Sequence, residues 1–358
     1  AGNGDHQGSG RVGGDGVMKK LLPEVCTIQY GFPFDSAKFS DSNGMPLIRI
    51  RDVVRGYSET YTTEEYKSEY IVHENDLLIG MDGEFNIAKW GKTPALLNQR
   101  VCRLAPKDSI DKDYLFYFMP IALKRIEKKT PFVTVKHLSA KELNKIEIPV
   151  LSLEEQRKIA ETLSKVDKLI AFREQQLAKL DEVVKARFVE MFGEIEDCDK
   201  WESKIWNEVV TIKNGRDYKK VLVSDGGYPV VGTGGEIARA SKYLCPENTI
   251  VVGRKGSINN PMLMKEKFWN VDTAFGVIPN SDYLHYQYFY CFCKFYNFMK
   301  LNKATTLPST TKADLLKIRI NIPPLELQNQ FASFVEEVDK SRLLSNHSLF
   351  CLLYTSDA

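Results

Sequence analysis

The sequence lacks long apolar runs, paired cysteines and grouped histidines. No stretch approaches the ~20 consecutive apolar residues of a membrane-spanning helix. The N-terminal segment also has no apolar core of the kind found in signal peptides. The seven cysteines form no CxxC pair, and the five histidines show no ligand spacing. We therefore expect a cytoplasmic protein with no membrane contact, buried thiols and no metal site.

Motifs of nucleotide chemistry are missing as well. The sequence contains no G-x-x-x-x-G-K-S/T phosphate-binding loop. Gly232, Gly234 and Gly235 in GTGG do not make a dinucleotide-binding fingerprint. Acidic residues are common, yet none of them forms an evident metal-binding set of a nuclease. These absences argue against catalysis, and we predict that the chain is not an enzyme and holds no cofactor.

The composition is that of a globular protein with room for two domains. Of its 358 residues, 43% are hydrophobic and 27% are charged. Residues 1–17 differ, because they contain seven glycines and almost nothing apolar. We expect this segment to be a disordered leader and the native start to be Met18.

One stretch, from Leu153 to Phe192, has no glycine or proline and consists almost entirely of good helix formers. Apolar residues recur in it at alternating steps of four and three, with Arg173 and Arg187 at the two remaining positions. This spacing predicts a long helix with a coiled-coil seam. The predicted seam residues are Ile159, Leu163, Val166, Ile170, Leu177, Leu180, Val184 and Met191, followed in a second helix by Phe331, Val335 and Val338.

An internal repeat places this helix in a larger plan. EVCTIQYG from Glu24 matches EVVTIKNG from Glu208, ENDLLIG from Glu74 matches ENTIVVG from Glu247, and KIEIPVLSLEEQ from Lys145 matches KIRINIPPLELQ from Lys317. The three blocks occur in the same order in both copies. Their separation shrinks from 184 residues at the first block (24 to 208) to 172 at the last (145 to 317), so the copies share a framework and differ in loops.

Each copy reads as a β-rich module followed by a helix. Strand-like runs end in glycine turns, the stretches 114–129 and 283–303 look helical, and Ser152 with Glu155 predicts a capping box at the start of the long helix. We predict the following parts: a leader at 1–17, a first recognition-type domain at 18–151, a spacer helix at 152–193, a second domain at 194–324, a shortened second helix at 325–345 and an atypical tail at 346–358.

These features predict an α+β fold with an internal tandem repeat. Two β-rich α/β domains would be separated by long helices that pack antiparallel as a coiled coil. The second helix is expected to be short, because Arg342 replaces the counterpart of Ile170 in the apolar stripe. The aromatic residues gathered between Tyr283 and Phe298 could stack on bases, but their density on one predicted helix favours core packing.

The alternation of module and helix, the strand-to-helix junction I-x-(I/P)-x-P-L-x-x-Q in both copies, and the segment ATTLPSTT before the second junction resemble the specificity subunit of a type I restriction-modification system. This resemblance covers roughly residues 18–342. It implies that each module is a target recognition domain for one half of a split DNA sequence, and that the helices fix the unread spacer. It also implies double-stranded DNA, two methyltransferase subunits and restriction (translocase) subunits as partners, with S-adenosylmethionine, ATP and Mg²⁺ held by those partners.

The charge distribution is consistent with such a role. Residues 201–312 contain 15 Lys and Arg against 9 Asp and Glu, and residues 19–141 contain 19 against 16, whereas the helix at 154–193 has 8 of each. Positive charge therefore belongs to the modules rather than to the helix. The bias is small, and an ordinary solvated surface explains it about as well.

Candidate DNA contacts are polar side chains on turns, and the foremost are Arg254 and Lys255 between Gly253 and Gly256. Structural glycine turns and a capping loop are the alternatives for these segments. The remaining candidates are Arg49, Arg51, Lys89, Lys136 and His137 in the first module, and Lys219, Lys220, Arg239, Lys242, Thr305, Thr306, Ser309 and Thr310 in the second.

Two other functions stay open at this point. A related system could use a partner in which methyltransferase and nuclease are fused, and the identity of the partner would discriminate. A pseudo-dimeric protein-interaction scaffold without DNA binding would show no salt-dependent shift with duplex DNA. The chain itself has no N/D-P-P-F/Y loop for a flipped base, so any methylation belongs to a partner.

Overall fold

The computed structural model describes residues 11–12, 18–129, 136–195, 200–304 and 307–355, with backbone alone for 11–12 and 343–355. The chain divides into two compact units, Ala1–Lys168 and Leu169–Ala358. The boundary lies inside one continuous helix, α5 (Leu153–Phe192), which begins in the first unit and ends in the second. At 1.5 Å per residue this helix is about 60 Å long.

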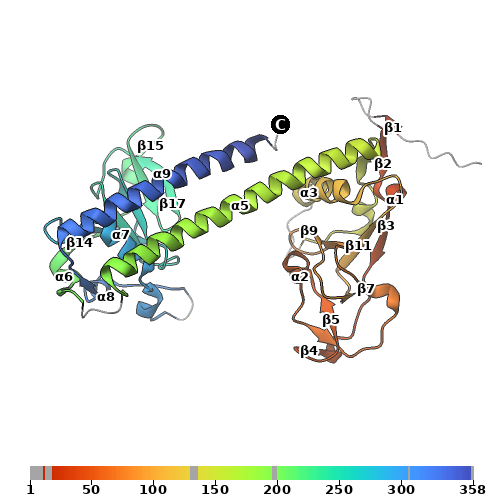
Figure 1. The fold of residues 1–358 in the computed structure, drawn as a ribbon, viewed down its shortest axis with the longest axis horizontal. Coiled ribbons are helices and arrows are strands. Elements are labelled where there is room, and N and C mark those ends of the chain that lie inside the picture. The colour runs from red at the N-terminus through yellow and green to blue at the C-terminus, as the bar shows by residue number, and fades with distance from the viewer. Residues whose placement is uncertain (1–10, 13–17, 130–135, 196–199, 305–306, 356–358) are drawn as a thin grey trace, which may run out of the picture. The chain divides into compact units, whose positions relative to one another are not determined.

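The described residues of the first unit form three sheets, whose strands lie beside the start of α5 (Figure 1). A four-stranded antiparallel sheet has the order β3-β11-β8-β9, a five-stranded sheet has the order β4-β6-β5-β10-β7, and a small sheet has the order β1-β2-β12. The strands are β1 (Arg11–Val12), β2 (Met18–Leu21), β3 (Cys26–Tyr30), β4 (Phe39–Ser40), β5 (Met45–Ile48), β6 (Tyr61–Thr62), β7 (Ile71–Val72), β8 (Leu77–Gly80), β9 (Ile87–Lys89), β10 (Ala95–Leu97), β11 (Val101–Pro106) and β12 (Glu147–Pro149). The helices before α5 are α1 (Leu22–Val25), α2 (Ile50–Arg55), α3 (Lys112–Lys129) and α4 (Ala140–Leu143).

The second unit repeats this plan. Its sheets have the orders β14-β21-β18-β19, β15-β17-β16-β20 and β13-β22, and β16 pairs with β20 in parallel as β5 pairs with β10 in the first unit. The strands are β13 (Ser203–Ile205), β14 (Val210–Asn214), β15 (Leu222–Val223), β16 (Tyr228–Gly232), β17 (Gly235–Ala240), β18 (Thr249–Gly253), β19 (Met262–Met264), β20 (Trp269–Asn270), β21 (Ala274–Pro279) and β22 (Arg319–Asn321). The helices are α6 (Trp206–Val209), α7 (Tyr286–Phe295), α8 (Lys312–Leu315) and α9 (Leu325–Thr355).

The first matching block is explained by a close approach of two backbones. A Cβ atom at Gly31 would lie 2.0 Å from the carbonyl oxygen of Asn98, and one at Gly215 would lie 1.8 Å from that of Val271. No side chain fits there, so both copies of the block end in glycine. The second block carries Asn75 (φ 67°) and Asn248 (φ 57°), and asparagine tolerates this left-handed conformation better than most residues.

The third block is explained by a buried glutamine at the junction between strand and helix. Gln156 accepts from the N–H of Asp111 at 2.7 Å and donates to the carbonyls of Ser109 at 3.2 Å and Leu151 at 2.8 Å. Gln328 accepts from the N–H of His285 at 2.8 Å. It donates to the carbonyls of Tyr283 at 2.9 Å and Pro323 at 2.8 Å. The glutamine of L-x-x-Q thus fixes the helix start to the module in each copy.

One connection that differs between the copies follows β5 in the first unit and β16 in the second. Twelve residues, 49–60, join β5 to β6 and contain α2, whereas Thr233 and Gly234 alone join β16 to β17. Met45 and its partner Thr62 are 17 positions apart, and Tyr228 and its partner Ala240 are 12 apart, so this connection accounts for five of the twelve positions by which the offset shrinks (184 to 172). The helix α2 is therefore a feature of the first unit without a counterpart at that place in the second.

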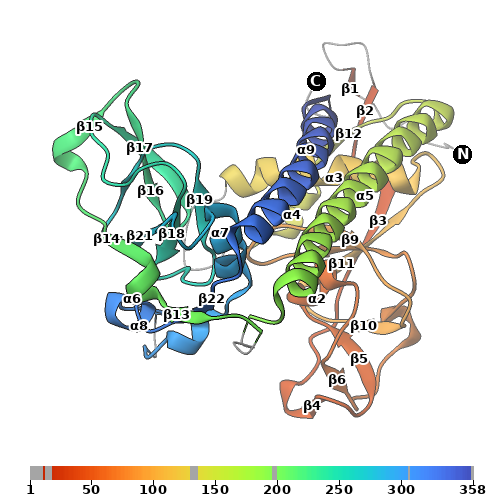
Figure 2. The ribbon, with the colours of Figure 1, turned by 60° about the vertical axis from the view of Figure 1, so that its left-hand side comes forward.

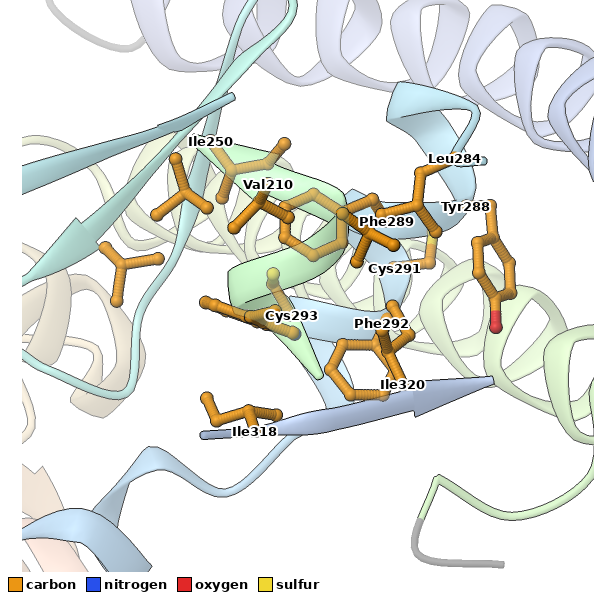
Figure 3. Packing of buried hydrophobic residues seen from close by; sticks show 14 of the residues in the cluster. Val210, Ile250, Leu284, Tyr288, Phe289, Cys291, Phe292, Cys293, Ile318 and Ile320 are labelled. Atoms are coloured by element: carbon orange, nitrogen blue, oxygen red, sulfur yellow. The ribbon is translucent and has the colours of Figure 1, made fainter. Parts of the chain in front are cut away.

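The core of the second unit gathers aromatic side chains from α5, α7 and α9. Figure 3 shows Tyr288, Phe289 and Phe292 of α7 within this cluster, and all three are buried. The preference for core packing over base stacking is confirmed for them. The predicted helix at 283–303 is shorter than expected, since α7 covers Tyr286–Phe295 and a 3-10 helix follows at Phe298–Leu301.

The two long helices run antiparallel within the second unit (Figure 2). The ring of Phe188 packs on Phe331 at 5.6 Å, and seven residues earlier Asp181 pairs with Arg342 at 2.8 Å. Arg342 therefore continues the helix contact through an ion pair instead of ending it. The predicted end of the second helix at residue 345 is wrong, because α9 continues to Thr355.

Some predicted details of α5 differ from the structure. Ser152 and Glu155 form the expected capping box, with the Glu155 carboxylate 3.0 Å from the N–H of Ser152. Ile159, however, is 38% exposed, and its neighbour Ala160 packs in the core of the first unit. In the second unit the most deeply buried α5 residues are Phe188 and Phe192, which follow the seam positions of Arg187 and Met191 by one residue.

The other seam residues lie at partly covered positions of α5 or in the core. Val184, Phe331, Val335 and Val338 are buried in the core of the second unit, and Leu180 and Met191 pack against it. Leu163, Val166, Ile170 and Leu177 are half-buried. In the N-terminal segment, β1 pairs with β2, so residues 11 and 12 are not a disordered leader, and the rest of 1–17 lies outside the described residues.

Candidate nucleic-acid interface

In each unit a glycine turn follows a buried strand, β8 or β18. Backbone hydrogen bonds join this turn to the segment that precedes the short helix α4 or α8. In the first unit the N–H of Gly83 donates to the carbonyl of Lys136 at 2.9 Å, and the N–H of Leu138 donates to that of Met81 at 2.7 Å. In the second unit the N–H of Gly256 donates to the carbonyl of Pro308 at 2.9 Å, and the N–H of Thr310 donates to that of Arg254 at 3.0 Å. We call residues 80–83 with 136–138, and residues 253–256 with 308–310, the turn–loop platforms.

The turns need glycine for a conformational reason. Gly83 has a φ of 78° and Gly256 a φ of 83°, in the left-handed region that other residues rarely adopt. Each turn follows a fully buried strand, β8 or β18, and therefore presents its middle residues at the end of a rigid element. Such a platform can hold a side chain in a fixed place against a ligand.

The platform of the second unit is cationic. Arg254 and Lys255 are both exposed. The guanidinium of Arg254 donates to the carbonyl of Asp272 at 3.4 Å and lies 6.0 Å from the ring of Phe275. Two cations on one turn can contact phosphate oxygens or the acceptors on a guanine edge.

The hydroxyl-rich segment before α8 is mostly structural where it is described. Thr310 is 3% exposed and its hydroxyl donates to the carbonyl of Gly253 at 2.8 Å, so its prediction as a DNA contact is wrong. Ser309 is half-buried and pairs with Lys255 in a short β-bridge. Thr305 and Thr306, also predicted as DNA contacts, lie outside the described residues.

The platform of the first unit carries a carboxylate, that of Asp82, which contacts two basic side chains. Asp82 accepts from Nδ1 of His137 at 2.5 Å, and its other oxygen lies 3.6 Å from Nε of Arg100. Since a carboxylate only accepts, we assign the His137 proton to Nδ1. His137 was predicted to touch DNA, and the structure places it against Asp82. Arg100 was missed, because nothing in the local sequence distinguishes it from other surface arginines.

The other candidates of the first unit differ in whether their charged groups have partners within the unit. Arg49 and Arg51 lie at the start of α2 and line a hollow with Asp41 and Glu59. Lys89 is paired with Asp113 at 2.8 Å. The ammonium of Lys136 donates to the carbonyl of Glu127 at 3.0 Å. Lys89 and Lys136 therefore already have partners within the unit.

The other candidates of the second unit lie on or near its second sheet. Lys219 and Lys220 are exposed on a 3-10 helix (Lys219–Val221), and Lys242 is exposed after β17. Arg239 on β17 pairs with Glu236 at 2.8 Å. These four residues lie on or beside the sheet β15-β17-β16-β20, whereas the turn at Arg254 follows β18 of the other four-stranded sheet.

The cysteines are buried thiols where the structure describes their side chains. Burial raises the pKa of Cys26, Cys102, Cys245 and Cys291 to about 12. These side chains are therefore protonated at neutral pH and are poor nucleophiles and metal ligands. No helix in the described part of the chain has the length and apolar character to cross a membrane.

Comparison with known families finds the same duplication. The family model described as "Type I restriction modification DNA specificity domain" matches residues 14–182 and again residues 198–349. Each match covers one module and most of the long helix that follows it. The repeat read from the sequence thus coincides with two occurrences of one family domain.

Two curated relatives show how far the likeness extends. The specificity subunit of the type I restriction enzyme EcoBI from Escherichia coli is 39% identical over 171 residues, which cover 47% of this chain and 35% of that protein. That match therefore spans about a third of the relative. The MjaVIII specificity subunit from Methanocaldococcus jannaschii is 25% identical over 360 residues, 82% of each chain.

Solved structures share the fold over nearly the whole chain. The S subunit of a type I restriction-modification system from M. genitalium matches with a TM-score of 0.59 at 17% identity, covering 95% of this chain and 93% of that one. A chain from a study of complex assembly and conformational transition of the type I R-M system matches with a TM-score of 0.52 at 15% identity, covering 94% of both. At these identities the likeness concerns the fold.

Proposed function

The chain belongs to the type I restriction-modification DNA specificity family, and from this membership we propose that it is a specificity subunit that recognises a split DNA target, one half with each unit. The observation that carries the proposal is the duplication. Two copies of one domain, each ending in a helix, suit a target made of two read segments with an unread spacer. A target with a single read segment would need only one copy of the domain.

Differences between the copies support two different half-sites. The turn–loop platform of the second unit presents Arg254 and Lys255, whereas the equivalent turn of the first unit carries Met81, which is buried, and Asp82. The first unit also has α2 with Arg49 and Arg51, at a place where the second unit has a two-residue turn. Base reading depends on side chains at such positions, while the shared framework fixes their placement.

The helix α5 is proposed to set the spacer and to dock partner subunits. It carries apolar side chains that the chain itself leaves exposed, among them Leu169 at 45%, Phe172 at 53% and Val183 at 48%. These residues are three and fourteen positions apart from Leu169, so they share a helix face. An exposed apolar face on a long helix suits contact with another protein.

The chemistry is assigned to those partners. In this proposal two methyltransferase subunits hold S-adenosylmethionine, and restriction subunits hold ATP and Mg²⁺. The chain described here binds DNA and its partners and is not itself catalytic, and the complex acts in the cytoplasm away from membranes.

Co-expression with the methyltransferase subunit, followed by mapping of methylated positions, tests the proposal. We expect one split sequence to be methylated, and we expect duplex DNA that contains it to bind with a steep salt dependence. Methylation that ignores sequence, or a complex that binds no duplex DNA, would contradict the proposal. The second result would favour a protein-interaction scaffold.

A further inference from the structure

The backbone of Arg100 is unusual. Its φ is 73°, and the only other described non-glycine residues with positive φ are Asn75 and Asn248, for which that conformation costs little. Arginine pays for this conformation with about 1 kcal/mol or more of backbone strain. The short connection between β10 and β11 keeps Arg100 there although glycine would suit the site better.

Arg100 lies at the turn–loop platform of the first unit. Its carbonyl accepts the N–H of Met81 at 2.8 Å, as the carbonyl of Thr273 accepts that of Arg254 at 2.8 Å in the second unit. Arg100 and Thr273 are therefore equivalent positions. The first unit lacks a cation on the turn itself, and Arg100 supplies one from the neighbouring connection.

The guanidinium is anchored and yet exposed. One carboxylate oxygen of Asp82 lies 3.6 Å from Nε of Arg100, the other is bonded to Nδ1 of His137, and Nη1 of Arg100 lies 3.3 Å from that Nδ1. The Arg100 side chain is nevertheless 53% exposed. Asp82 offsets part of its charge, and the contact with Nε favours one orientation of the planar fork of N–H donors.

On the basis of the proposed function, we infer that Arg100 reads a guanine in the half-site bound by the first unit, and that Asp82 and His137 are its positioning residues. An arginine fork donating to O6 and N7 of guanine is a discriminating contact in the major groove. Orientation matters for such a contact more than net charge does. The equivalent role in the second unit falls to Arg254 or Lys255.

The variant Arg100→Gly tests the inference without endangering the fold, because glycine accepts a φ of 73°. In the full complex with the methyltransferase subunit, we expect loss of preference at one base pair of one half-site by roughly 10-fold or more. The other half-site and the spacer should not change, and the melting temperature should not fall. Lys255→Ala should alter the opposite half-site. Arg125→Ala, at an exposed arginine of α3 in the same unit as Arg100, is the matched control with no effect.

Two further variants separate reading from other roles. Arg100→Lys keeps the charge without the fork and should relax the same base pair. Asp82→Asn removes the anchor's charge and should relax it too, with a steeper salt dependence because the arginine is no longer neutralised. An unchanged methylated sequence for Arg100→Gly overturns the inference. So does a uniform loss of affinity with unchanged sequence preference, which would indicate a phosphate contact. If the unsubstituted complex methylates no split sequence, the proposed function itself fails.

Discussion

Replacing Gln328 by leucine tests whether one buried amide holds the strand-to-helix junction of the second unit. Gln328 is 0% exposed, and its three hydrogen bonds join the start of α9 to the backbone of Tyr283, Pro323 and His285. Leucine has a similar volume and no polar atom. The substitution therefore leaves one N–H and two carbonyl groups without these partners.

The magnitude follows from those three bonds. Each is worth about 1 kcal/mol net, and part of the loss is offset because leucine is buried more favourably than glutamine. We expect the free energy of unfolding of the second unit to fall by about 2–3 kcal/mol. Gln156→Leu should act in the same way on the first unit, since Gln156 makes the equivalent three bonds.

Guanidinium denaturation of the full chain, followed by tryptophan fluorescence, measures this effect. Trp201, Trp206 and Trp269 all lie in the second unit and report on it. Gln330→Leu is the matched control, because Gln330 lies on the same helix and is exposed. A stability of Gln328→Leu within about 0.5 kcal/mol of this control would refute the argument that the buried amide fixes the junction.

Four more substitutions probe the framework. Gly215→Ala should destabilise the second unit by about 3 kcal/mol or more, because its Cβ would lie 1.8 Å from the Val271 carbonyl oxygen. Gly234→Ala is the control, since a Cβ there has no neighbour within 4 Å, and chemical denaturation should show no such loss for it. Phe188→Ala should cost about 3–5 kcal/mol in the same assay, and a cost below about 1 kcal/mol would contradict its place in the core. Burial lowers the pKa of His285, so the folded unit binds a proton there less readily than the unfolded chain, and stability should fall as the pH drops through about 6.5. His285→Asn, which keeps an acceptor for the Gln287 N–H, should weaken this pH dependence in thermal melts at pH 5.5 and 7.5, and an equal dependence would count against it.

The repeat could be predicted from the sequence because its matching residues answer local demands. Gly31 and Gly215 are forced by a close backbone contact, and Gly83 and Gly256 by a left-handed turn. Such demands leave the same residue type in both copies. The order of the blocks, the capping box and the helix that crosses between the units followed from the same local signals.

The details of the helix faces could not be predicted in this way. A strict seven-residue seam drifts by about 20° per heptad on a straight helix, so the face that packs in the first unit is not the face that packs in the second. In both units the buried residue follows a seam position by one, Ala160 after Ile159 and Phe188 after Arg187, and the spacing of apolar residues alone does not indicate this offset. Arg342 seemed to end the stripe because its partner, Asp181, lies 161 residues away in the sequence.

The candidate interface was predicted in part for the same reason. The Gly253–Gly256 turn could be recognised from its glycines, and its exposed cations follow directly from the sequence. The role of Arg100 depends on its φ and on contacts with Asp82 and His137, at separations of 18 and 37 residues (82 to 100 and 100 to 137). Thr310 looked exposed in a hydroxyl-rich segment, and only the folded chain shows its bond to Gly253.

The most direct test of the account is to lengthen α5 and map the methylated target. Four residues inserted between Arg173 and Leu177 lie ahead of Asp181 and Phe188, which contact α9. They add about 6 Å of helix, or about two base-pair steps of DNA. If α5 separates two base-reading units, the complex should methylate the same two half-sites with a spacer longer by one or two base pairs. An active complex with an unchanged spacer would contradict the account.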